Sequence, residues 1–254
     1  MSNVVIVNGG TSGLGLEVAQ SLLSEGYQVI VTGLMDAAFD QASMILAKYT
    51  NCSLKALDIT KDQEVQAFAQ EVEATYGSIY ALVNNAAIGP LGTILTTDAQ
   101  TWTNIMSVNL TGPFLMCKHF LPLLMKNGGS IVNIGSGAGW GKPNMAAYAT
   151  SKGGLVAFTT ALALDHFYDK VRVNMVIPGG GGIHAGMSLG RVNGDTSKLT
   201  ANAIGSVAGR PIDGYDMAEA VKFLISDKAQ TISGTIIDVG CFFHQGSSTP
   251  FRSK

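Results

Sequence analysis

Tyr148 and Lys152 lie four positions apart inside an apolar run, residues 145–167, that is predicted to form one helix. Residues at this spacing lie one above the other on the same helix face, so the phenol and the ammonium are expected to be neighbours. A fixed positive charge favours phenolate over phenol, which would make Tyr148 a proton donor and acceptor near neutral pH. The pair alone does not distinguish such a site from a half-buried Tyr beside a solvated Lys.

A second group of residues suited to chemistry follows the first predicted strand, residues 4–7. Gly9, Gly13 and Gly15 follow that strand and lead into a helical pattern over residues 14–23. Glycines at a helix N-terminus let the backbone approach a dinucleotide pyrophosphate, toward which free N–H groups and the helix dipole point. A ligand-free turn is the alternative, but the strand, the glycines and the helix stand in the order that the dinucleotide motif requires.

The elements that must position these residues alternate between strands and helices along the whole chain. Strands are predicted at 4–7, 28–32, 54–57, 80–83, 130–134, 172–176 and 234–239, and helices at 14–23, 37–49, 60–76, 98–108, 112–125, 145–167 and 217–226. Thr60 with Gln63 is predicted to form a capping box, and Asp216 to cap the last helix. The alternation predicts an α/β fold: a Rossmann-like, doubly wound parallel sheet in three α/β/α layers, as a single domain over 1–254. A stretch rich in Gly, Ser and Met, at about 179–209, is predicted to be a substrate lid.

Composition narrows the class of protein. The chain has 254 residues, of which 13% are charged and 46% hydrophobic, and a net charge of −2, as expected for a compact globular protein without a basic surface for nucleic acid or membrane. No apolar stretch reaches spanning length, and the N-terminus does not resemble a signal segment. Cys52, Cys117 and Cys241 are far apart and lack metal-ligand spacing. We therefore expect a cytoplasmic protein with reduced thiols and no metal.

Besides the glycines after the first predicted strand, candidate site residues follow the carboxyl ends of the next five strands. These are Gly33 after the second strand, Asp58 after the third, Asn84-Asn85 after the fourth, Ser136 after the fifth and Pro178-Gly179 after the sixth. Ligands of open parallel sheets bind beyond the carboxyl ends of the strands. The agreement among these strand ends indicates an enzyme more strongly than any single motif does.

Over its whole length the chain resembles the short-chain dehydrogenase/reductase family. The resemblance is carried by residues 8–15 (Asn-Gly-Gly-Thr-Ser-Gly-Leu-Gly), Asp58, Asn84-Asn85-Ala86, Asn109, Ser136, Tyr148 with Lys152, residues 173–179, Gly209-Arg210-Pro211, and Ser233-Gly234 with Asp238. It implies an NAD(P)-dependent oxidoreductase that interconverts a secondary alcohol and a ketone by hydride transfer, usually as a homotetramer.

The resemblance also implies roles for individual residues. Tyr148 would be the general acid/base, Lys152 would lower its pKa and hold the nicotinamide ribose, Ser136 would hydrogen-bond the substrate oxygen, and Asn109 would anchor a water relay to Lys152. The residues expected to contact the cofactor are Gly9, Thr11, Ser12, Gly13, Leu14, Gly15, Gly33, Asp58, Ile59, Asn85, Ala86, Ala87, Tyr148, Lys152, Pro178 and Gly179.

The chain departs from the family pattern in four places. Asn8 replaces a Thr, Ala87 replaces the last Gly of an Asn-Asn-Ala-Gly run, and Asp238-Val239-Gly240 replaces Asp-Gly-Gly. Residues 180–184 (Gly-Gly-Gly-Ile-His) lack the Thr that usually holds the nicotinamide amide. This leaves open an alternative function, a dinucleotide-sensing or regulatory protein without redox turnover. A non-redox elimination is a third reading, although relatives of that kind disrupt the glycine loop.

The end of the second strand bears on the choice of cofactor. Gly33, Leu34 and Met35 offer no cation to a 2′-phosphate, and Asp36 could accept a bond from the ribose or cap the next helix. With Thr11 and Ser12 also uncharged, NAD(H) is favoured over NADP(H).

The substrate pocket is expected to be apolar. It would be formed by residues 87–91, residues 137–140 and the lid, with Trp140, Met187 and Leu189 lining it and His184 or Arg191 as candidate contacts for an anion.

Overall fold

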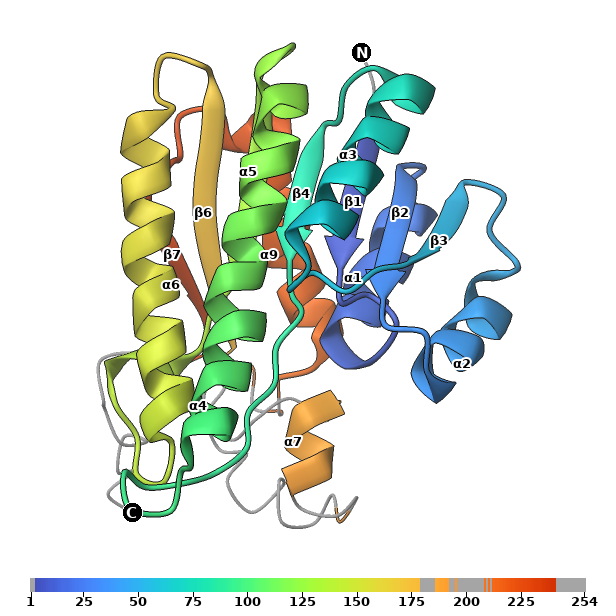
Figure 1. Ribbon diagram of the computed structural model, residues 1–254. Helices are drawn as coiled ribbons and strands as arrows, with labels where there is room; N and C mark the ends of the chain where they lie inside the picture. The colour runs from blue at the N-terminus through green and yellow to red at the C-terminus, as the bar shows by residue number, and fades with distance from the viewer. Residues whose placement is uncertain are drawn as a thin grey trace.

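The computed structural model describes residues 3–178, 186–191, 195, 208, 210 and 212–240. Its centre is a seven-stranded parallel sheet with the strand order β3-β2-β1-β4-β5-β6-β7 (Figure 1). The strands are β1 (Val4–Asn8), β2 (Gln28–Gly33), β3 (Cys52–Ala56), β4 (Ala81–Asn84), β5 (Gly129–Ile134), β6 (Val171–Pro178) and β7 (Ile236–Val239). The predicted doubly wound parallel sheet is confirmed. Strand order reverses between β1 and β4, which is where such folds bind ligands.

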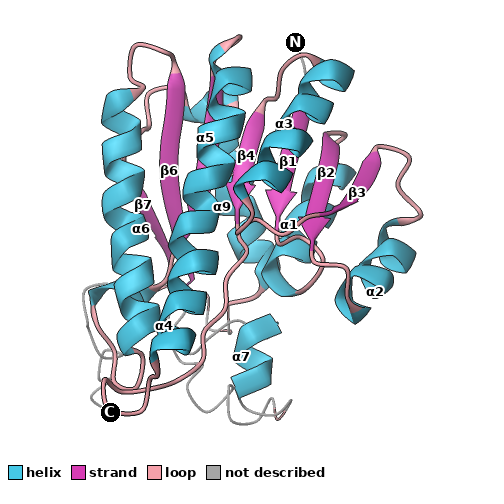
Figure 2. Cartoon of the chain, in the orientation of Figure 1, coloured by secondary structure: helices cyan, strands magenta, loops and turns pink. Residues whose placement is uncertain are grey.

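Helices cover both faces of the sheet (Figure 2). They are α1 (Gly13–Ser24), α2 (Ala37–Leu46), α3 (Asp62–Tyr76), α4 (Ala99–Met106), the π-helical turn η1 (Ser107–Thr111), α5 (Gly112–Met125), the 3₁₀ turn η2 (Gly137–Trp140), α6 (Ala146–Asp165), α7 (Gly186–Arg191), α9 (Gly214–Ile225) and the 3₁₀ turn η3 (Asp227–Ala229). Helices α3, α5 and α6 lie on the face toward the viewer in Figure 1, and α1 and α9 lie behind the sheet.

Adjacent residues of a strand point to opposite faces of the sheet, and apolar side chains are buried on both faces. On β1, Ile6 packs into the same buried cluster as Phe68 and Phe120 of α3 and α5. Its neighbour Val7 joins the cluster that contains Val18 of α1 and Val221 of α9. Burial on both faces explains why β1 is a continuous run of β-branched residues up to Val7 instead of an alternating pattern.

A chain of buried side-chain hydrogen bonds crosses the centre of the sheet. Asn8, Asn84 and Asn133 are register partners on β1, β4 and β5. Asn8 Nδ2 donates to Asn84 Oδ1 (3.4 Å), Asn84 Nδ2 to Asn133 Oδ1 (2.9 Å), and Asn133 Nδ2 to Thr159 Oγ1 of α6 (2.9 Å). Asn8, which replaces a Thr of the family pattern, thus begins a polar connection from the glycine turn to α6.

Two predicted helix starts were wrong. Helix α3 begins at Asp62 with Lys61 as its N-cap residue, because the Thr60 hydroxyl donates to Asp58 Oδ1 (2.7 Å) instead of capping the helix. Helix α9 begins at Gly214, and its cap is Asp213, whose Oδ1 accepts from the Asp216 amide (3.1 Å). The Asp216 carboxylate in turn accepts from the Asp213 amide (3.1 Å), so Asp216 completes the capping box from the third helical position.

Several predictions fall on residues outside the described part of the chain. Of the predicted lid, residues 179–185, which include His184, and most of 192–209 lie outside it, and so does Cys241. The backbone of α7 is described, but the side chains of Leu189 and Arg191 lie outside the description. Cys52 and Cys117 are free thiols, Cys117 fully buried. None of the helices in the described ranges is long and apolar enough to cross a membrane.

Candidate active site

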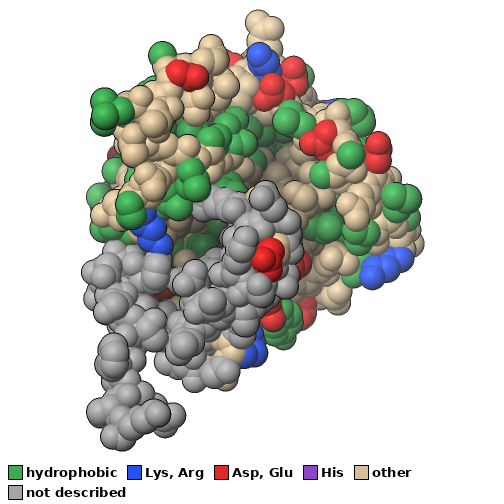
Figure 3. All heavy atoms as spheres, turned by 90° about the horizontal axis from the view of Figure 1, so that it is seen from below, with side chains coloured by type: hydrophobic (Ala, Val, Ile, Leu, Met, Phe, Trp, Pro, Cys, Tyr) green, Lys and Arg blue, Asp and Glu red, His purple; other side chains and the backbone are tan. Residues whose placement is uncertain are grey.

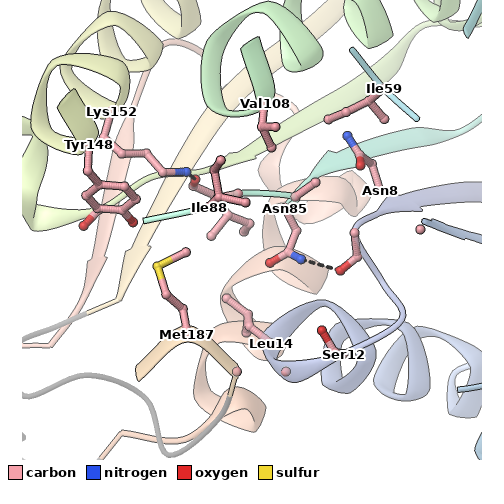
Figure 4. Close-up of a pocket in the computed structure, with 18 of the residues that line it drawn as sticks. Asn8, Ser12, Leu14, Ile59, Asn85, Ile88, Val108, Tyr148, Lys152 and Met187 are labelled. Atoms are coloured by element: carbon pink, nitrogen blue, oxygen red, sulfur yellow. Dashed lines mark hydrogen bonds between the residues drawn. The ribbon is translucent and has the colours of Figure 1, made fainter. Parts of the chain in front are cut away.

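A cavity of about 440 Å³ opens at the carboxyl ends of the strands. Figure 3 looks onto this edge of the molecule from below, and Figure 4 shows the wall of the cavity. The predicted site residues that line it are Gly9, Thr11, Ser12, Gly13, Leu14, Gly33, Asp58, Ile59, Asn85, Ala86, Ala87, Ser136, Tyr148, Lys152 and Pro178. Gly15 and Asn109 are not among the lining residues, and Gly179 lies outside the described residues.

Glycine is required at Gly9, in the turn after β1, and at Gly15, in the first turn of α1. Gly9 has φ +68°, and a Cβ there would lie 2.6 Å from the Cα of Ala86. A Cβ on Gly15 would collide with the Gly9 carbonyl oxygen and with Nδ2 of Asn85. That amide donates to the Gly9 carbonyl at 2.7 Å, drawn as the dashed line in Figure 4. Gly15 therefore lets α1 pack against the turn without itself lining the cavity.

The N-terminus of α1 faces the cavity through Gly13 and Leu14. Its N-cap residue, Ser12, makes no side-chain capping bond, and the first turn contains no acidic residue. The first backbone N–H groups of a helix have no partner within the helix, and the helix dipole makes this end positive. The glycine cradle together with this helix end fits the pyrophosphate of a dinucleotide.

Two acidic side chains lie beside the cavity at the ends of β2 and β3. Asp36 caps α2, with Oδ1 accepting from the Phe39 amide at 3.0 Å, and also lines the cavity. Asp58 Oδ1 accepts from the Thr60 amide (2.9 Å) and hydroxyl. Both alternatives considered for Asp36, capping and facing the ligand site, are therefore compatible with its position.

Tyr148 and Lys152 project from α6 into the opposite end of the cavity (Figure 4). They are 7% and 3% exposed, and Lys152 Nζ lies 6.0 Å from the centroid of the Tyr148 ring. The same Nζ donates to the carbonyl oxygen of Ile134, the last residue of β5, at 2.8 Å. Burial lowers the pKa of Lys152 to about 8, because the low-dielectric interior disfavours the charged form.

Ser136 lies between β5 and η2 and lines the same cavity as Tyr148. It is the N-cap residue of η2, where its Oγ accepts from the Ala138 amide at 3.2 Å. The cap fixes the side chain at the strand end and leaves the hydroxyl proton for another acceptor. One wall of the cavity thus carries a hydroxyl, a phenol and an ammonium.

Asn109 occupies the π-helical turn η1 and is fully buried. Its Oδ1 accepts from the Ile88 amide (2.8 Å), and its Nδ2 donates to the Ile88 carbonyl (2.8 Å) and to Ser151 Oγ (3.0 Å). Ser151 in turn donates to the Tyr148 carbonyl (2.7 Å). The side chain of Asn109 therefore joins the loop after β4 to the helix that carries Tyr148. Ser151 was not predicted as a site residue, although its position next to Lys152 in the predicted helix was a signal for it.

The apolar part of the pocket differs from the sequence prediction. Ala87, Ile88, Gly137, Ala138 and Met187 line the cavity as expected. Residues 89–91, Gly139 and Trp140, which is 45% exposed, are not among the lining residues. Val108, Lys142 and Met145 line it and had not been singled out. Ala87 lacks a positive φ, so replacing the family's glycine introduces no backbone strain there.

A doubly wound sheet with a glycine turn, a free helix N-terminus and a cavity at the switch point defines a dinucleotide-binding α/β protein. A family model described as enoyl-(acyl carrier protein) reductase matches residues 9–241. The 2-(S)-hydroxypropyl-CoM dehydrogenase 3 of Xanthobacter autotrophicus is 38% identical over 248 residues, covering 94% of this chain and 95% of that protein.

Two solved structures of complexes with NADP or NADH are also similar to this chain. The RhlG/NADP active-site complex of Pseudomonas aeruginosa has a TM-score of 0.85 at 25% identity, covering 95% of this chain and 96% of that one. The 3-ketoacyl-(acyl-carrier-protein) reductase of Brucella melitensis, complexed with NADH, has a TM-score of 0.82 at 27% identity, with coverage of 93% and 96%. The chain belongs to the short-chain dehydrogenase/reductase family, and it is an NAD(P)-dependent oxidoreductase.

Proposed function

We propose that the protein interconverts a secondary alcohol and a ketone by hydride transfer, with Tyr148 as general acid/base, and that residues 1–254 act as one dinucleotide-binding and catalytic domain. The observation that carries the proposal is that Ser136, Tyr148 and Lys152 line one end of the cavity whose other end is formed by the glycine turn. The similar Xanthobacter protein is named for a 2-hydroxypropyl compound, in which the hydroxyl stands on a secondary carbon.

In the proposed mechanism Ser136 and Tyr148 act on the oxygen of the substrate, and Lys152 acts on Tyr148. In ketone reduction, the hydroxyl of Ser136 donates a hydrogen bond to the carbonyl oxygen, and Tyr148 delivers a proton as negative charge develops there. The Lys152 ammonium, held by the Ile134 carbonyl, stabilises the phenolate that Tyr148 leaves behind. The nicotinamide supplies or accepts the hydride when it is bound. In the reverse direction Tyr148 accepts the proton of the alcohol.

The proposed cofactor contacts follow the length of the cavity. Gly9, Thr11, Ser12, Gly13 and Leu14 would hold the pyrophosphate, with Gly15 supporting the turn. Gly33, Asp58, Ile59, Asn85, Ala86 and Ala87 would surround the adenosine side, and Tyr148, Lys152, Pro178 and Gly179 the nicotinamide side. Asn109 would position the site by holding Ile88 and Ser151, and its anchoring of a water relay to Lys152 stays a prediction.

We also propose a preference for NAD(H) over NADP(H), based on the charge of Asp36 in the cavity wall. Asp36→Asn keeps a side-chain oxygen that can cap α2 but removes the negative charge that would oppose a 2′-phosphate. We expect wild-type protein to bind NADH more tightly than NADPH, and the variant to narrow that ratio about fivefold, as for an exposed charge contact. Calorimetric titration with both reduced cofactors measures the ratio.

Asp40→Asn is the matched control, since Asp40 is exposed in the first turn of α2 and does not line the cavity. It should leave the ratio unchanged. An equal affinity of the wild type for NADH and NADPH would refute the preference. If the wild type bound neither dinucleotide, the cofactor site itself would be refuted.

The proposed reaction is tested by incubating the wild type with a panel of secondary alcohols and ketones and following the absorbance of NADH and NADPH. Turnover of at least one panel member supports the proposal. Dinucleotide binding without turnover on any member would instead support the alternative, a sensing or regulatory protein. From the family resemblance we propose further that the protein is a cytoplasmic homotetramer, for which light scattering of the purified protein gives the subunit number.

A further inference from the structure

Lys142 is a cationic side chain of the cavity wall that has no role in the proposed mechanism. It is half-buried, and it lies in the loop between η2 and α6, so that it falls between Ser136 and Tyr148 in the sequence. It lines the same cavity as both residues. A lysine therefore lines the end of the cavity where the substrate is expected.

Backbone contacts on both sides fix the position of Lys142. The turn before it closes at Gly141, whose φ of +99° ends η2. After it, the Gly92 amide donates to the Asn144 carbonyl (2.8 Å), and the Ala146 amide donates to the Gly92 carbonyl (3.1 Å). These bonds attach the loop that carries Lys142 to the loop after β4. The backbone of the loop that carries Lys142 is thus attached to a second loop beside the cavity.

Among the described lining residues, the acidic and the basic side chains lie at different ends of the cavity. Among the described lining residues the acidic ones are Asp36 and Asp58, which follow β2 and β3. Ser136 follows β5, and β1 and β4 lie between β2 and β5 in the sheet. Three strand spacings correspond to roughly 14 Å. At the Ser136 end, the charged side chains among the described lining residues are Lys142 and Lys152, so the field there favours an anion.

The surroundings at this end strengthen the effect of the charge. Ile88, Met145 and Met187 line the cavity near the catalytic residues, and Figure 4 shows Met187 reaching toward Tyr148 from α7. Apolar side chains exclude water and lower the local dielectric, so an ammonium beside them interacts more strongly with an opposite charge than it would in water.

We propose that Lys142 binds a negatively charged group of the substrate, so that the substrate is a ketone or secondary alcohol that also carries a carboxylate, phosphate or sulfonate on an aliphatic chain. The proposal rests on the proposed function and extends it from a reaction type to a substrate class. Tyr148 and Ser136 hold the reacting oxygen, Lys142 holds the anionic group, and the apolar residues contact the chain between them.

The test uses methyl ketones that differ only in charge. The ketones are 4-oxopentanoate, 5-oxohexanoate and 6-oxoheptanoate, each paired with the primary amide of the same acid. For each pair, kcat/KM of the carboxylate is compared with kcat/KM of the amide, once with NADH and once with NADPH as the reductant. The chain-length series allows for different distances between the carbonyl and the anion. We expect the wild type to prefer the best carboxylate to its amide by at least about tenfold, as for a charge-assisted hydrogen bond.

Variants then assign this preference to Lys142. Lys142→Met should reduce the carboxylate-to-amide ratio to about one, mainly through KM, and Lys142→Glu should invert it. Lys142→Arg should restore most of it. Lys48→Met, a loss of the same charge at an exposed position outside the cavity, should keep the wild-type ratio. Equal rates for carboxylates and amides in the wild type, or an unchanged ratio in Lys142→Met, would overturn the proposal.

The two proposals fail in different ways. If the wild type reduces neither series with either cofactor, the proposed function fails for these compounds, and Lys142 is then judged by equilibrium binding of 5-oxohexanoate to protein saturated with NADH. Binding that is weakened about tenfold by Lys142→Met supports the anion site. Binding that is absent in the wild type, or the same in the two proteins, overturns it.

Discussion

Tyr148→Phe is expected to reduce kcat/KM for the best substrate by roughly a thousandfold or more, because general acid/base catalysis contributes up to about 10⁴-fold and the phenylalanine ring has no proton to transfer. Tyr148 is 7% exposed, and Phe differs from it by one oxygen, so the packing of α6 should be retained. The dissociation constant of the reduced dinucleotide should stay within about threefold of the wild-type value, equivalent to less than 1 kcal/mol. Steady-state kinetics and calorimetry on the same preparation measure the two quantities.

Tyr168→Phe provides the matched control for this result. Tyr168 follows the end of α6 and is 92% exposed, so the same loss of a hydroxyl there should leave the kinetics unchanged. A Tyr148→Phe enzyme that kept near-wild-type rates on its best substrate would eliminate Tyr148 as the acid/base. If the variant lost dinucleotide binding together with turnover, the phenol would be needed for assembling the site and not specifically for proton transfer.

Lys152→Met is expected to reduce kcat by at least roughly a hundredfold, because it removes the charge that would stabilise the Tyr148 phenolate. The same variant has a distinct signature in stability. The ammonium of Lys152 is buried and its pKa is lowered from 10.5 to about 8, which means that the folded protein holds the charged form at a free-energy cost. Methionine fills a similar volume without this cost.

The direction of the pH effect follows from proton binding in the two states. Below about pH 8, Lys152 is protonated in the folded and the unfolded protein alike, so stability does not change with pH on its account. Between about pH 8 and 10.5 the unfolded chain still holds a proton that the folded protein has released, so the free energy of unfolding rises with pH. The rise over this window is up to roughly 3 kcal/mol.

Chemical denaturation of the dinucleotide-free protein between pH 7 and 10.5 measures this rise. Other titrating groups contribute to the wild type and to Lys152→Met alike, so the difference between the two curves isolates Lys152. The wild type should gain stability relative to the variant as pH increases. Lys48→Met, at an exposed site, should show no such difference. A pH-independent difference between wild type and Lys152→Met would mean that the lysine is not buried as a charged group.

The parts of this site that could be predicted from the sequence depend on local patterns. The glycine turn is recognisable because Gly9, Gly13 and Gly15 lie within the seven residues that lead from a strand into a helix. Tyr148 and Lys152 can be paired from the sequence because residues four positions apart always lie on the same face of a helix. Helix boundaries were less predictable, since Asp58 binds the Thr60 hydroxyl and removes it as a cap for α3. A short polar side chain has several local partners, and only the folded backbone selects one.

By itself the sequence determined the order of strands and helices, the glycine turn and the Tyr148–Lys152 pair, because strand and helix periodicity are properties of neighbouring residues. The tertiary structure decided the contacts between distant residues: Asn109 binds Ile88 and Ser151, which are 21 and 42 positions away, and Asn8 binds Asn84, which is 76 positions away. It also decided that Lys142 lines the cavity and Trp140 does not. Such partners are selected by the packing of whole elements against one another, and local periodicity carries no information about that packing.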